Sequence, residues 1–146
     1  MPIPNNVDPD LAEKYRTLDL TLPTVGVETI KTDSLIWFPY QGADVPEDQE
    51  VVLETEEFTA LCPWTGLPDQ GTLTIRYMPL ERLLEMKSLK AYLLSFRSVG
   101  IVQEDACARI YDDLKSLLEP RCDSLRVVLN YLPRGGIQTT CSLPPQ

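Results

Sequence analysis

The feature that most constrains the fold is a change in the spacing of apolar residues along the chain. Two stretches, QEVVLETEEF (49–58) and GTLTIRYMP (71–79), alternate between apolar and polar residues, as half-buried strands do. Residues 83–96 and 106–118 then place apolar side chains at the spacing of a helix. The pattern therefore predicts two strands followed by two helices, which SVG at 98–100 separates.

The last part of the chain returns to strand-like patterns. SLRVVLNYLP (124–133) and GGIQTTCSL (135–143) flank a PRGG turn, and Pro120 ends the second helix. Strands that come in adjacent pairs predict hairpins of an antiparallel sheet, with the helices on one face. We therefore expect an α+β fold of order ββααββ with a four-stranded sheet. Its open edges favour pairing between subunits, so we also expect an oligomer.

The chain length of 146 residues predicts one domain. Residues 1–34 show little periodicity and are predicted to form an irregular N-terminal arm, so the domain is assigned to residues 35–146. DSLIWFPYQG (33–42) is a short apolar stretch typical of an edge strand. The absence of a long apolar run and of a signal-like start predicts a cytoplasmic protein with no membrane span and with reduced thiols.

The charge and the missing histidine narrow the chemistry. There are 13 basic and 22 acidic residues, a net charge of −9, which disfavours a broad nucleic-acid-binding surface. No histidine is present, so Ser-His-Asp and Cys-His devices and histidine-bearing zinc sites are excluded. The four cysteines contain no C-x-x-C pair, so we expect no metal site.

Cys62 lies in a turn rich in proline and glycine, CPWTGLPD, that ends at Asp69. A cysteine there can be half of a disulfide, a metal ligand, a small core residue or a nucleophile. A nucleophilic thiolate needs an acid or base nearby, and without histidine a carboxylate such as Asp69 is the candidate. The alternative is that Cys62 is a buried small residue and Asp69 a turn-forming one.

Three further positions could bind a ligand. Lys87 and Lys90 share one face of the first predicted helix, a geometry that suits phosphate groups but also a solvated basic edge. Glu104 in QED (103–105) opens the second helix, where it either caps the helix or accepts two N–H groups from a purine-like edge. Arg134 in PRGG is a second phosphate-binding candidate or simply a turn residue.

Three stretches together resemble one family. They are EFTALCPWTGLPDQGTLTIRY (57–77), LEMKSLKAYLLSFRSVGIVQED (84–105) and LPRGGI (132–137). In order and spacing they resemble the 7-cyano-7-deazaguanine reductases of the tunnelling-fold superfamily, nitrile reductases of queuosine biosynthesis, a tRNA-modification pathway. The resemblance covers residues 35–141. It implies the tunnelling fold, assembly of the subunits into an oligomeric barrel, and active sites between neighbouring subunits.

The resemblance implies a role for each matching residue. Cys62 matches the nucleophile that adds to the nitrile carbon and forms a thioimide, and Asp69 matches its acid/base partner. Glu104 matches the glutamate that anchors the guanine-like edge of 7-cyano-7-deazaguanine, and Glu85 and Gln103 are assigned to the same substrate site.

The cofactor that the resemblance implies is NADPH. Lys87 and Lys90 of the EMKSLKAY motif, with Arg134 of PRGG, match the residues that hold its phosphates. Ser88 and Gly135 belong to the same two motifs and are predicted to line the cofactor site.

The chain departs from the family pattern at a few positions. Gln103 stands at the position where the family pattern has a histidine. An amide can donate a hydrogen bond but cannot deliver a proton at neutral pH, as a histidine can. Met86 and Ala91 are also unusual within the helix motif. The alternative function is that of the similar archaeosine synthases, which add ammonia to the same nitrile on tRNA, and only this alternative requires tRNA. A third is a non-catalytic binding module with the same fold.

Overall fold

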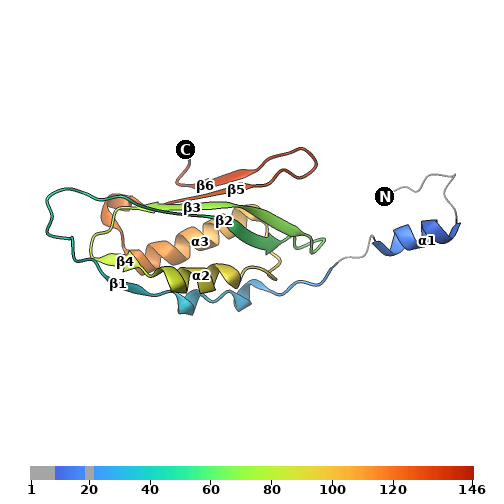
Figure 1. The fold of residues 1–146 in the computed structure, drawn as a ribbon, viewed down its shortest axis with the longest axis horizontal. Helices are drawn as coiled ribbons and strands as arrows, with labels where there is room; N and C mark the ends of the chain where they lie inside the picture. Colours follow the sequence, from blue (N-terminus) through green and yellow to red (C-terminus); the bar gives the residue numbers. More distant parts are fainter. Residues whose placement is uncertain (1–8, 19–21) are drawn as a thin grey trace.

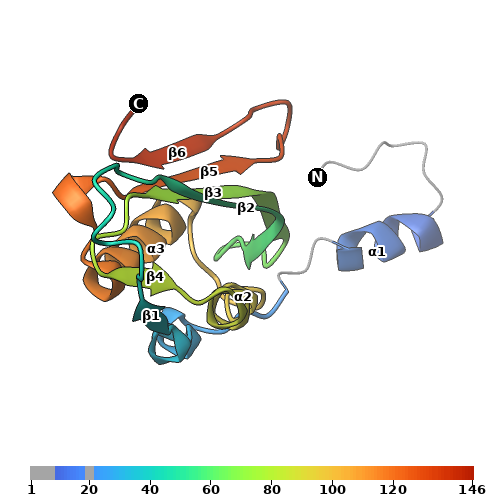
Figure 2. The same cartoon turned by 60° about the vertical axis from the view of Figure 1, so that its left-hand side comes forward.

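The computed structural model describes residues 9–18 and 22–146, and a four-stranded antiparallel sheet forms one layer of it. Helices α2 (Met86–Leu94) and α3 (Gln103–Leu118) lie together beneath this sheet (Figures 1 and 2). The predicted α+β architecture, with its antiparallel sheet and two helices on one face, is thus confirmed. The strands, in spatial order, are β2 (Val51–Leu61), β3 (Pro68–Tyr77), β5 (Arg126–Tyr131) and β6 (Thr140–Leu143).

A bulge in β2 sets which side chains of that strand face the helices. Thr55 lies opposite Leu73, but Phe58 lies opposite Gly71, so β2 contains one extra residue between the two pairs. Because side chains alternate along a strand, an extra residue moves every later side chain to the other face. The bulge therefore turns Phe58 and Ala60 toward the helices, on the side where β3 buries Leu73.

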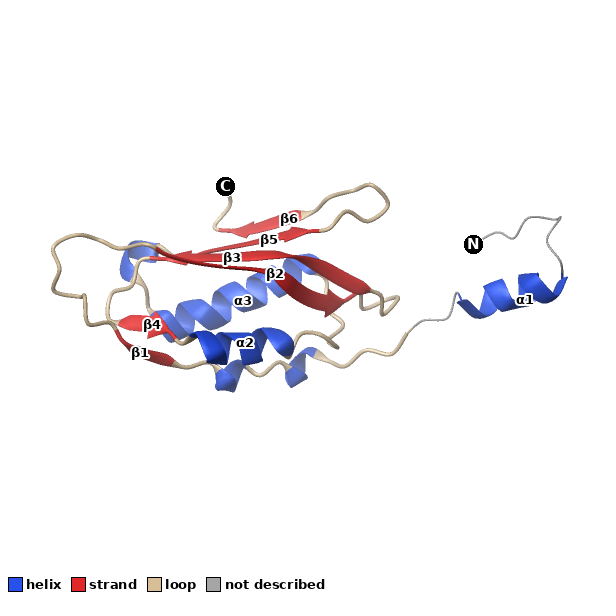
Figure 3. Cartoon of the chain, viewed as in Figure 1, coloured by secondary structure: helices blue, strands red, loops and turns tan. Residues whose placement is uncertain are grey.

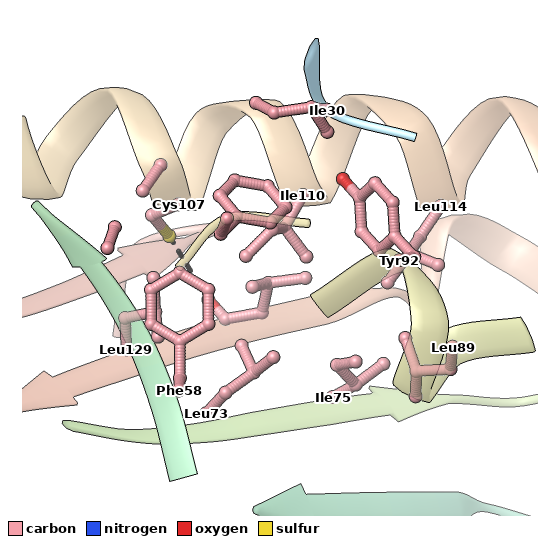
Figure 4. Packing of buried hydrophobic residues seen from close by; sticks show 14 of the residues in the cluster. Ile30, Phe58, Leu73, Ile75, Leu89, Tyr92, Cys107, Ile110, Leu114 and Leu129 are labelled. Carbon is pink, nitrogen blue, oxygen red and sulfur yellow. Dashed lines mark hydrogen bonds between the residues drawn. The ribbon is translucent and has the colours of Figure 1, made fainter. Parts of the chain in front are cut away.

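Aromatic rings fill the space between the sheet and the helices (Figure 4). Phe58 of β2 contacts Phe96 edge to face, with ring centroids 5.4 Å apart, and Phe96 contacts Tyr92 of α2 in the same way at 5.3 Å. Ile110 and Leu114 of α3 complete the layer and are fully buried. The predicted inner face of the second helix is thus the core face, and apolar burial holds the layers together.

Helix α2 begins later than the apolar spacing predicts. Leu83 and Leu84 lie in a short strand, β4 (Arg82–Leu84), which pairs with β1 (Trp37–Pro39) in a separate two-stranded sheet. The helix starts only after Glu85, whose backbone is extended and whose carboxylate accepts hydrogen bonds from the N–H groups of Lys87 and Ser88 at 2.9 and 2.6 Å. The capping interaction thus overrides the apolar spacing at this point.

The N-terminal segment also differs from the irregular arm that the sequence predicts. Helix α1 (Pro9–Leu18) lies to one side of the sheet and helices (Figure 3), and two short 3₁₀ helices follow, η1 (Val27–Thr29) and η2 (Thr32–Ser34). Ile30 is buried in the core between them. The parts of the predicted arm at 1–8 and 19–21 lie outside the described residues, and the domain boundary at residue 35 stays a prediction.

The C-terminal half follows the prediction with one shortened strand. Helix α3 ends at Leu118, where Glu119 adopts a left-handed conformation, and Pro120 follows as expected. The last predicted strand, 135–143, is realised only at Thr140–Leu143. A third 3₁₀ helix, η3 (Arg121–Asp123), connects α3 to β5. None of the helices in the described part of the chain is both long and apolar enough to cross a membrane.

The packing of α3 against the sheet yields a stability prediction. Leu114 is fully buried, whereas Leu94 on α2 remains 45% exposed. We expect Leu114→Ala to lower the free energy of unfolding by about 3 kcal/mol, because it removes buried methyl groups and leaves a cavity. Leu94→Ala, the matched control, should change it by less than about 0.5 kcal/mol. Urea denaturation measures both, and equal losses would contradict this description of the core.

Candidate functional site

Cys62 lies at the start of a closed turn between β2 and β3. Its N–H donates to the carbonyl of Leu67 at 2.9 Å, and its own carbonyl accepts from the N–H of Gly66 at 2.8 Å. Gly66 has a φ of 73°, in the left-handed region that favours glycine. The turn therefore holds the Cys62 backbone firmly, with its side chain 7% exposed.

Asp69 lies on β3 directly opposite Ala60, so it shares the helix-facing side of the sheet with the residues of the core. It is only 4% exposed, which is unusual for a carboxylate and requires a charged or hydrogen-bonding partner. That partner is Arg134, whose Nη1 donates to Oδ1 of Asp69 in an ion pair. Asp69 is thus a buried acid held by a cation rather than an exposed turn residue.

The PRGG sequence forms a two-residue hairpin turn that presents Arg134. Arg134 and Ile137 exchange backbone hydrogen bonds of 2.9 and 3.0 Å around Gly135 and Gly136. Both glycines have positive φ, 58° and 78°, the geometry of a type I′ turn. The N–H of Leu132 donates to the carbonyl of Gln70 at 2.8 Å, so the hairpin is attached to β3 next to Asp69.

The environment of Cys62 favours the thiolate. The pKa of this thiol is lowered, chiefly because the hydroxyl of Thr65 hydrogen-bonds the sulfur. Burial acts in the opposite direction, while the backbone N–H groups of Thr65 and Trp64 and the guanidinium of Arg134 add to the lowering. Cys62 therefore has the electrostatic environment of a reactive cysteine.

Two other cysteines are shifted the opposite way. Burial raises the pKa of Cys107 to about 11, and its thiol donates a hydrogen bond to the carbonyl of Val127 within the core. Burial also raises the pKa of Cys141. Cys107 is thus a core residue, and the four cysteines are free thiols. In the described part of the chain, no three side chains of His, Cys, Asp or Glu gather as a metal site would require.

The N-terminal end of α3 lies beside the Cys62 turn. Leu61 donates to the carbonyl of Val99 at 2.9 Å and accepts from the N–H of Ile101 at 3.0 Å, which joins β2 to the segment that leads into α3. Gln103 opens that helix, and its carbonyl accepts from the Tyr131 hydroxyl at 3.4 Å. Glu104 follows on the first turn, exposed to solvent.

Tyr131 connects these groups electrostatically. Burial raises the pKa of its hydroxyl, and the negative charges of Asp69 and Glu104 contribute further to the increase. Both carboxylates therefore lie close enough to Tyr131 to act on it. Tyr131 and Thr65 are the site residues that the sequence analysis did not identify. The hydroxyl of Thr65, three residues after Cys62 in the same turn, was the available signal.

The lysines of the helix motif lie in a different place. Lys87 and Lys90 line a groove of about 700 Å³ between α2 and β2, with Arg97 on the same wall and Glu54 and Glu57 on the β2 side. We call this the lysine groove. None of Cys62, Asp69 and Arg134 is among the described residues that line it. Gly135 belongs to the PRGG turn and likewise lies outside the groove.

Two residues predicted to bind ligands have structural roles here. Ser88 is buried, accepts a hydrogen bond from the N–H of Ile36 at 3.0 Å and donates to the carbonyl of Glu85 at 2.8 Å. Glu85 caps α2, and hydrogen bonds from the backbone N–H groups of Lys87 and Ser88 lower its pKa. Both hold the start of α2 against the segment before β1, and their assignment to ligand sites stays a prediction.

A thiol with a lowered pKa and a buried carboxylate lie at one end of an antiparallel sheet, and this is the pair of groups that cysteine chemistry on an α+β scaffold requires. Comparison with known proteins identifies the scaffold. The family model described as "QueF-like protein" matches residues 68–144. The chain belongs to this family.

Named relatives cover nearly the whole chain. A Caldicellulosiruptor bescii protein named NADPH-dependent 7-cyano-7-deazaguanine reductase is 52% identical over 130 residues, 88% of this chain and 94% of that protein. A Thermotoga maritima protein of the same name is 46% identical over 119 residues, 81% and 82% of the two chains. The crystal structure of the archaeosine synthase QueF-Like in the apo form superposes with a TM-score of 0.58. The superposition covers 64% of this chain and 89% of the archaeosine synthase chain, at 19% sequence identity. This likeness supports the fold alone.

The role of Thr65 can be tested through the reactivity of Cys62. Because a lowered pKa increases the thiolate fraction at neutral pH, Thr65→Val should slow alkylation of Cys62 by iodoacetamide at neutral pH and leave the rate at high pH unchanged. Thr65→Ser keeps the hydroxyl and should retain the original profile. Peptide mass spectrometry assigns the modified cysteine at each pH. An unaltered profile in Thr65→Val would mean that another group lowers the pKa.

Proposed function

We propose that this chain reduces the nitrile of 7-cyano-7-deazaguanine to the aminomethyl group of 7-aminomethyl-7-deazaguanine, with NADPH as the reductant. The observation that carries the proposal is the identity of 52% and 46% with proteins named for this activity, over at least four fifths of each chain. The pairing of a thiol of lowered pKa with a buried carboxylate supplies the groups that the chemistry needs.

Cys62 is the nucleophile in this proposal. Its sulfur forms a bond to the nitrile carbon, and one π electron pair of the C≡N bond moves onto nitrogen, which takes up a proton. The product is a thioimide on Cys62, whose C=N carbon accepts hydride more readily than a free nitrile does. The burial of Cys62 within its turn helps to keep water from this intermediate.

Asp69 is the acid that supplies the proton to the nitrile nitrogen. Asp69 lies opposite Ala60, and Ala60 is two residues before Cys62. Because side chains alternate along a strand, the carboxyl group of Asp69 lies on the side of the sheet toward which Cys62 continues. Glu104 is proposed to accept hydrogen bonds from the N–H groups of the deazaguanine ring, with Gln103 beside it. These two residues open α3 at the end of the sheet where the Cys62 turn lies.

Lys87 and Lys90 fit the requirements of NADPH, because they place two positive charges on one wall of a groove otherwise lined mainly by apolar residues. We assign the phosphates of the cofactor to these lysines. When bound, NADPH supplies hydride, and two hydrides are needed to convert the nitrile to the amine. The exposed side chain of Met86 beside the two lysines offers apolar surface to the rest of the cofactor.

We also propose a homo-oligomer with its active sites between subunits, in the form of the barrel that the resemblance implies. Strands β2 and β6 are the two edges of the four-stranded sheet and are available for pairing. Trp64, 73% exposed beside the nucleophile, and the exposed Leu132 and Ile137 of the PRGG hairpin surround the site with apolar surface. The lysine groove and the Cys62 site are separate in one chain, and assembly offers a way to combine them.

The alternative of an archaeosine synthase-like reaction receives no further support. The structure with that name is 19% identical to this chain, a likeness that concerns the fold and not the reaction. The lysines that suit a nicotinamide cofactor are present and line a groove. The net charge of −9 also disfavours tRNA as the partner. A cytoplasmic location stays a prediction.

Covalent capture of the nitrile is the first test. Incubation with 7-cyano-7-deazaguanine alone should increase the intact mass of the chain by one substrate mass. Subsequent addition of NADPH should lead to its oxidation, which is measured as the loss of its near-ultraviolet absorbance. Cys62→Ala should abolish both signals, whereas Cys122→Ala, an exposed cysteine outside the site, should abolish neither. The reductase proposal would be contradicted if the unaltered protein forms the adduct but does not oxidise NADPH, while the Gln103→His variant does oxidise it.

The lysine groove is tested separately. Lys87→Ala and Lys90→Ala should each raise the KM for NADPH by about tenfold, since each removes one charged contact worth about 1–2 kcal/mol. Formation of the adduct on Cys62 in the absence of NADPH should be unchanged. Lys115→Ala on α3, whose amine lies near Asp123 and outside the groove, is the matched control. A loss of adduct formation in either groove variant would contradict the assignment.

A further inference from the structure

Arg134 lies apart from the two lysines with which the sequence groups it. Its Nη1 donates to Oδ1 of Asp69, and its guanidinium is one of the groups that lower the pKa of the Cys62 thiol. It is absent from the described residues that line the lysine groove. A single guanidinium thus pairs with one of the groups that the proposed reaction uses and acts electrostatically on the other.

We infer that Arg134 is a positioning residue that orients Cys62 and Asp69 for reaction, rather than a ligand of the cofactor phosphates. The inference rests on the proposed function, because it takes Cys62 as the nucleophile and Asp69 as the acid. It adds a residue to the catalytic end of the molecule and leaves Lys87 and Lys90 as the phosphate-binding pair.

The charges at the site explain why a cation is needed there. Tyr131 of β5 lies within the electrostatic reach of Asp69 and of Glu104 on α3, as well as of Cys141 and Cys107, and Arg134 acts on the Cys62 thiol. Ionisation of Cys62 adds a negative charge at the end of the sheet where Asp69 is already buried, and like charges disfavour one another. Arg134 is 46% exposed on its side chain, against 4% for Asp69, so it covers the buried acid from the solvent side. It compensates the negative charge without being buried itself.

The guanidinium is suited to act on both groups. It is planar, stays charged at all relevant pH values and carries five N–H donors, so it pairs with Asp69 while its charge favours the thiolate of Cys62. A lysine offers the same charge but as a single point on a flexible stem. Arginine therefore supplies a geometry, in addition to a charge, that lysine does not reproduce.

The hairpin keeps the guanidinium in this position. The type I′ turn at Gly135 and Gly136 fixes the backbone of Arg134, and the hydrogen bond from Leu132 to Gln70 attaches the hairpin to β3 one residue after Asp69. Positive φ at both glycines makes this turn costly for any other residue. The sequence PRGG is thereby explained as the support of a positioning arginine.

Arg134 also affects the proton-transfer step. Asp69 takes up the thiol proton of Cys62 as the thiolate forms and passes it to the nitrile nitrogen when sulfur bonds to the nitrile carbon, which returns Asp69 to the carboxylate. A carboxylate accepts a stronger hydrogen bond from a guanidinium than the neutral acid does. Arg134 therefore stabilises the state that follows proton transfer, and its removal should slow the chemical step rather than weaken cofactor binding.

The test compares Arg134→Ala, Arg134→Lys and Arg76→Ala. Arg76 lies on the same strand as Asp69 but pairs with the exposed Glu50 at the other end, which makes it the matched control. In the ligand-free protein, Arg134→Ala should move the pH profile of Cys62 alkylation to higher pH, while Arg134→Lys, which keeps the charge without the planar fork, should move it in the same direction by less. In turnover assays Arg134→Ala should lower kcat about a hundredfold, the low end of what a positioned acid contributes, with the KM for NADPH changed less than about threefold.

A different pattern would overturn the inference. If Arg134→Ala raises the KM for NADPH, leaves kcat intact and leaves the alkylation profile unchanged, the residue is a phosphate ligand instead. Arg134→Ala could fail to fold because Asp69 is left as a buried charge. In that case Arg134→Ala is combined with Asp69→Asn and compared with Asp69→Asn alone. An alkylation profile that does not differ between these two variants also overturns the inference. The alkylation result does not depend on nitrile reduction, so it separates failure of this inference from failure of the proposed function.

Discussion

The one-residue bulge in β2 is the constraint on which the site depends. Thr55 pairs with Leu73 and Phe58 with Gly71, so the residues after the bulge face the helices instead of solvent. This reversal puts Phe58 into the aromatic core and carries the strand into the turn with Ala60, opposite Asp69, on the inner face. A regular strand would present the opposite set of side chains to the helices. The core and the turn that contains Cys62 therefore depend on the same irregularity.

The site itself is organised around a buried carboxylate. Asp69 is stable in the interior because Arg134 provides a positive charge, and the same guanidinium contributes to the lowered pKa of Cys62. The larger contribution to that pKa comes from the hydroxyl of Thr65 within the turn. A short turn and a distant hairpin thus jointly create one reactive thiol, while burial without such partners raises the pKa of Cys107.

The sequence predicted much of this fold because its elements have strong local signals. The alternation of residues 71–79 and the helical spacing of 106–118 correspond to β3 and α3 to within three residues at each end. The prediction was wrong where local signals conflict. Leu83 and Leu84 have helical spacing but lie in β4, since the local cap at Glu85 starts the helix only after them and since β4 pairs with β1, which lies far away in the chain. Helix α1 has only ten residues, although Leu11, Tyr15 and Leu18 recur at helical spacing, and it lies in the segment predicted to be irregular.

By itself, the sequence determined the α+β class, the order of the main elements, the family and the candidate pair Cys62 and Asp69, because each depends on residue type and short-range spacing. Only the tertiary structure decided which groups meet. Lys87 and Lys90 line their groove, whereas Arg134 lies beside Asp69 and away from that groove. Ser88 and Glu85 form hydrogen bonds at the start of α2. Contacts between residues 65 positions apart, such as Arg134 and Asp69, arise from sheet topology and turn geometry, and no local pattern encodes them.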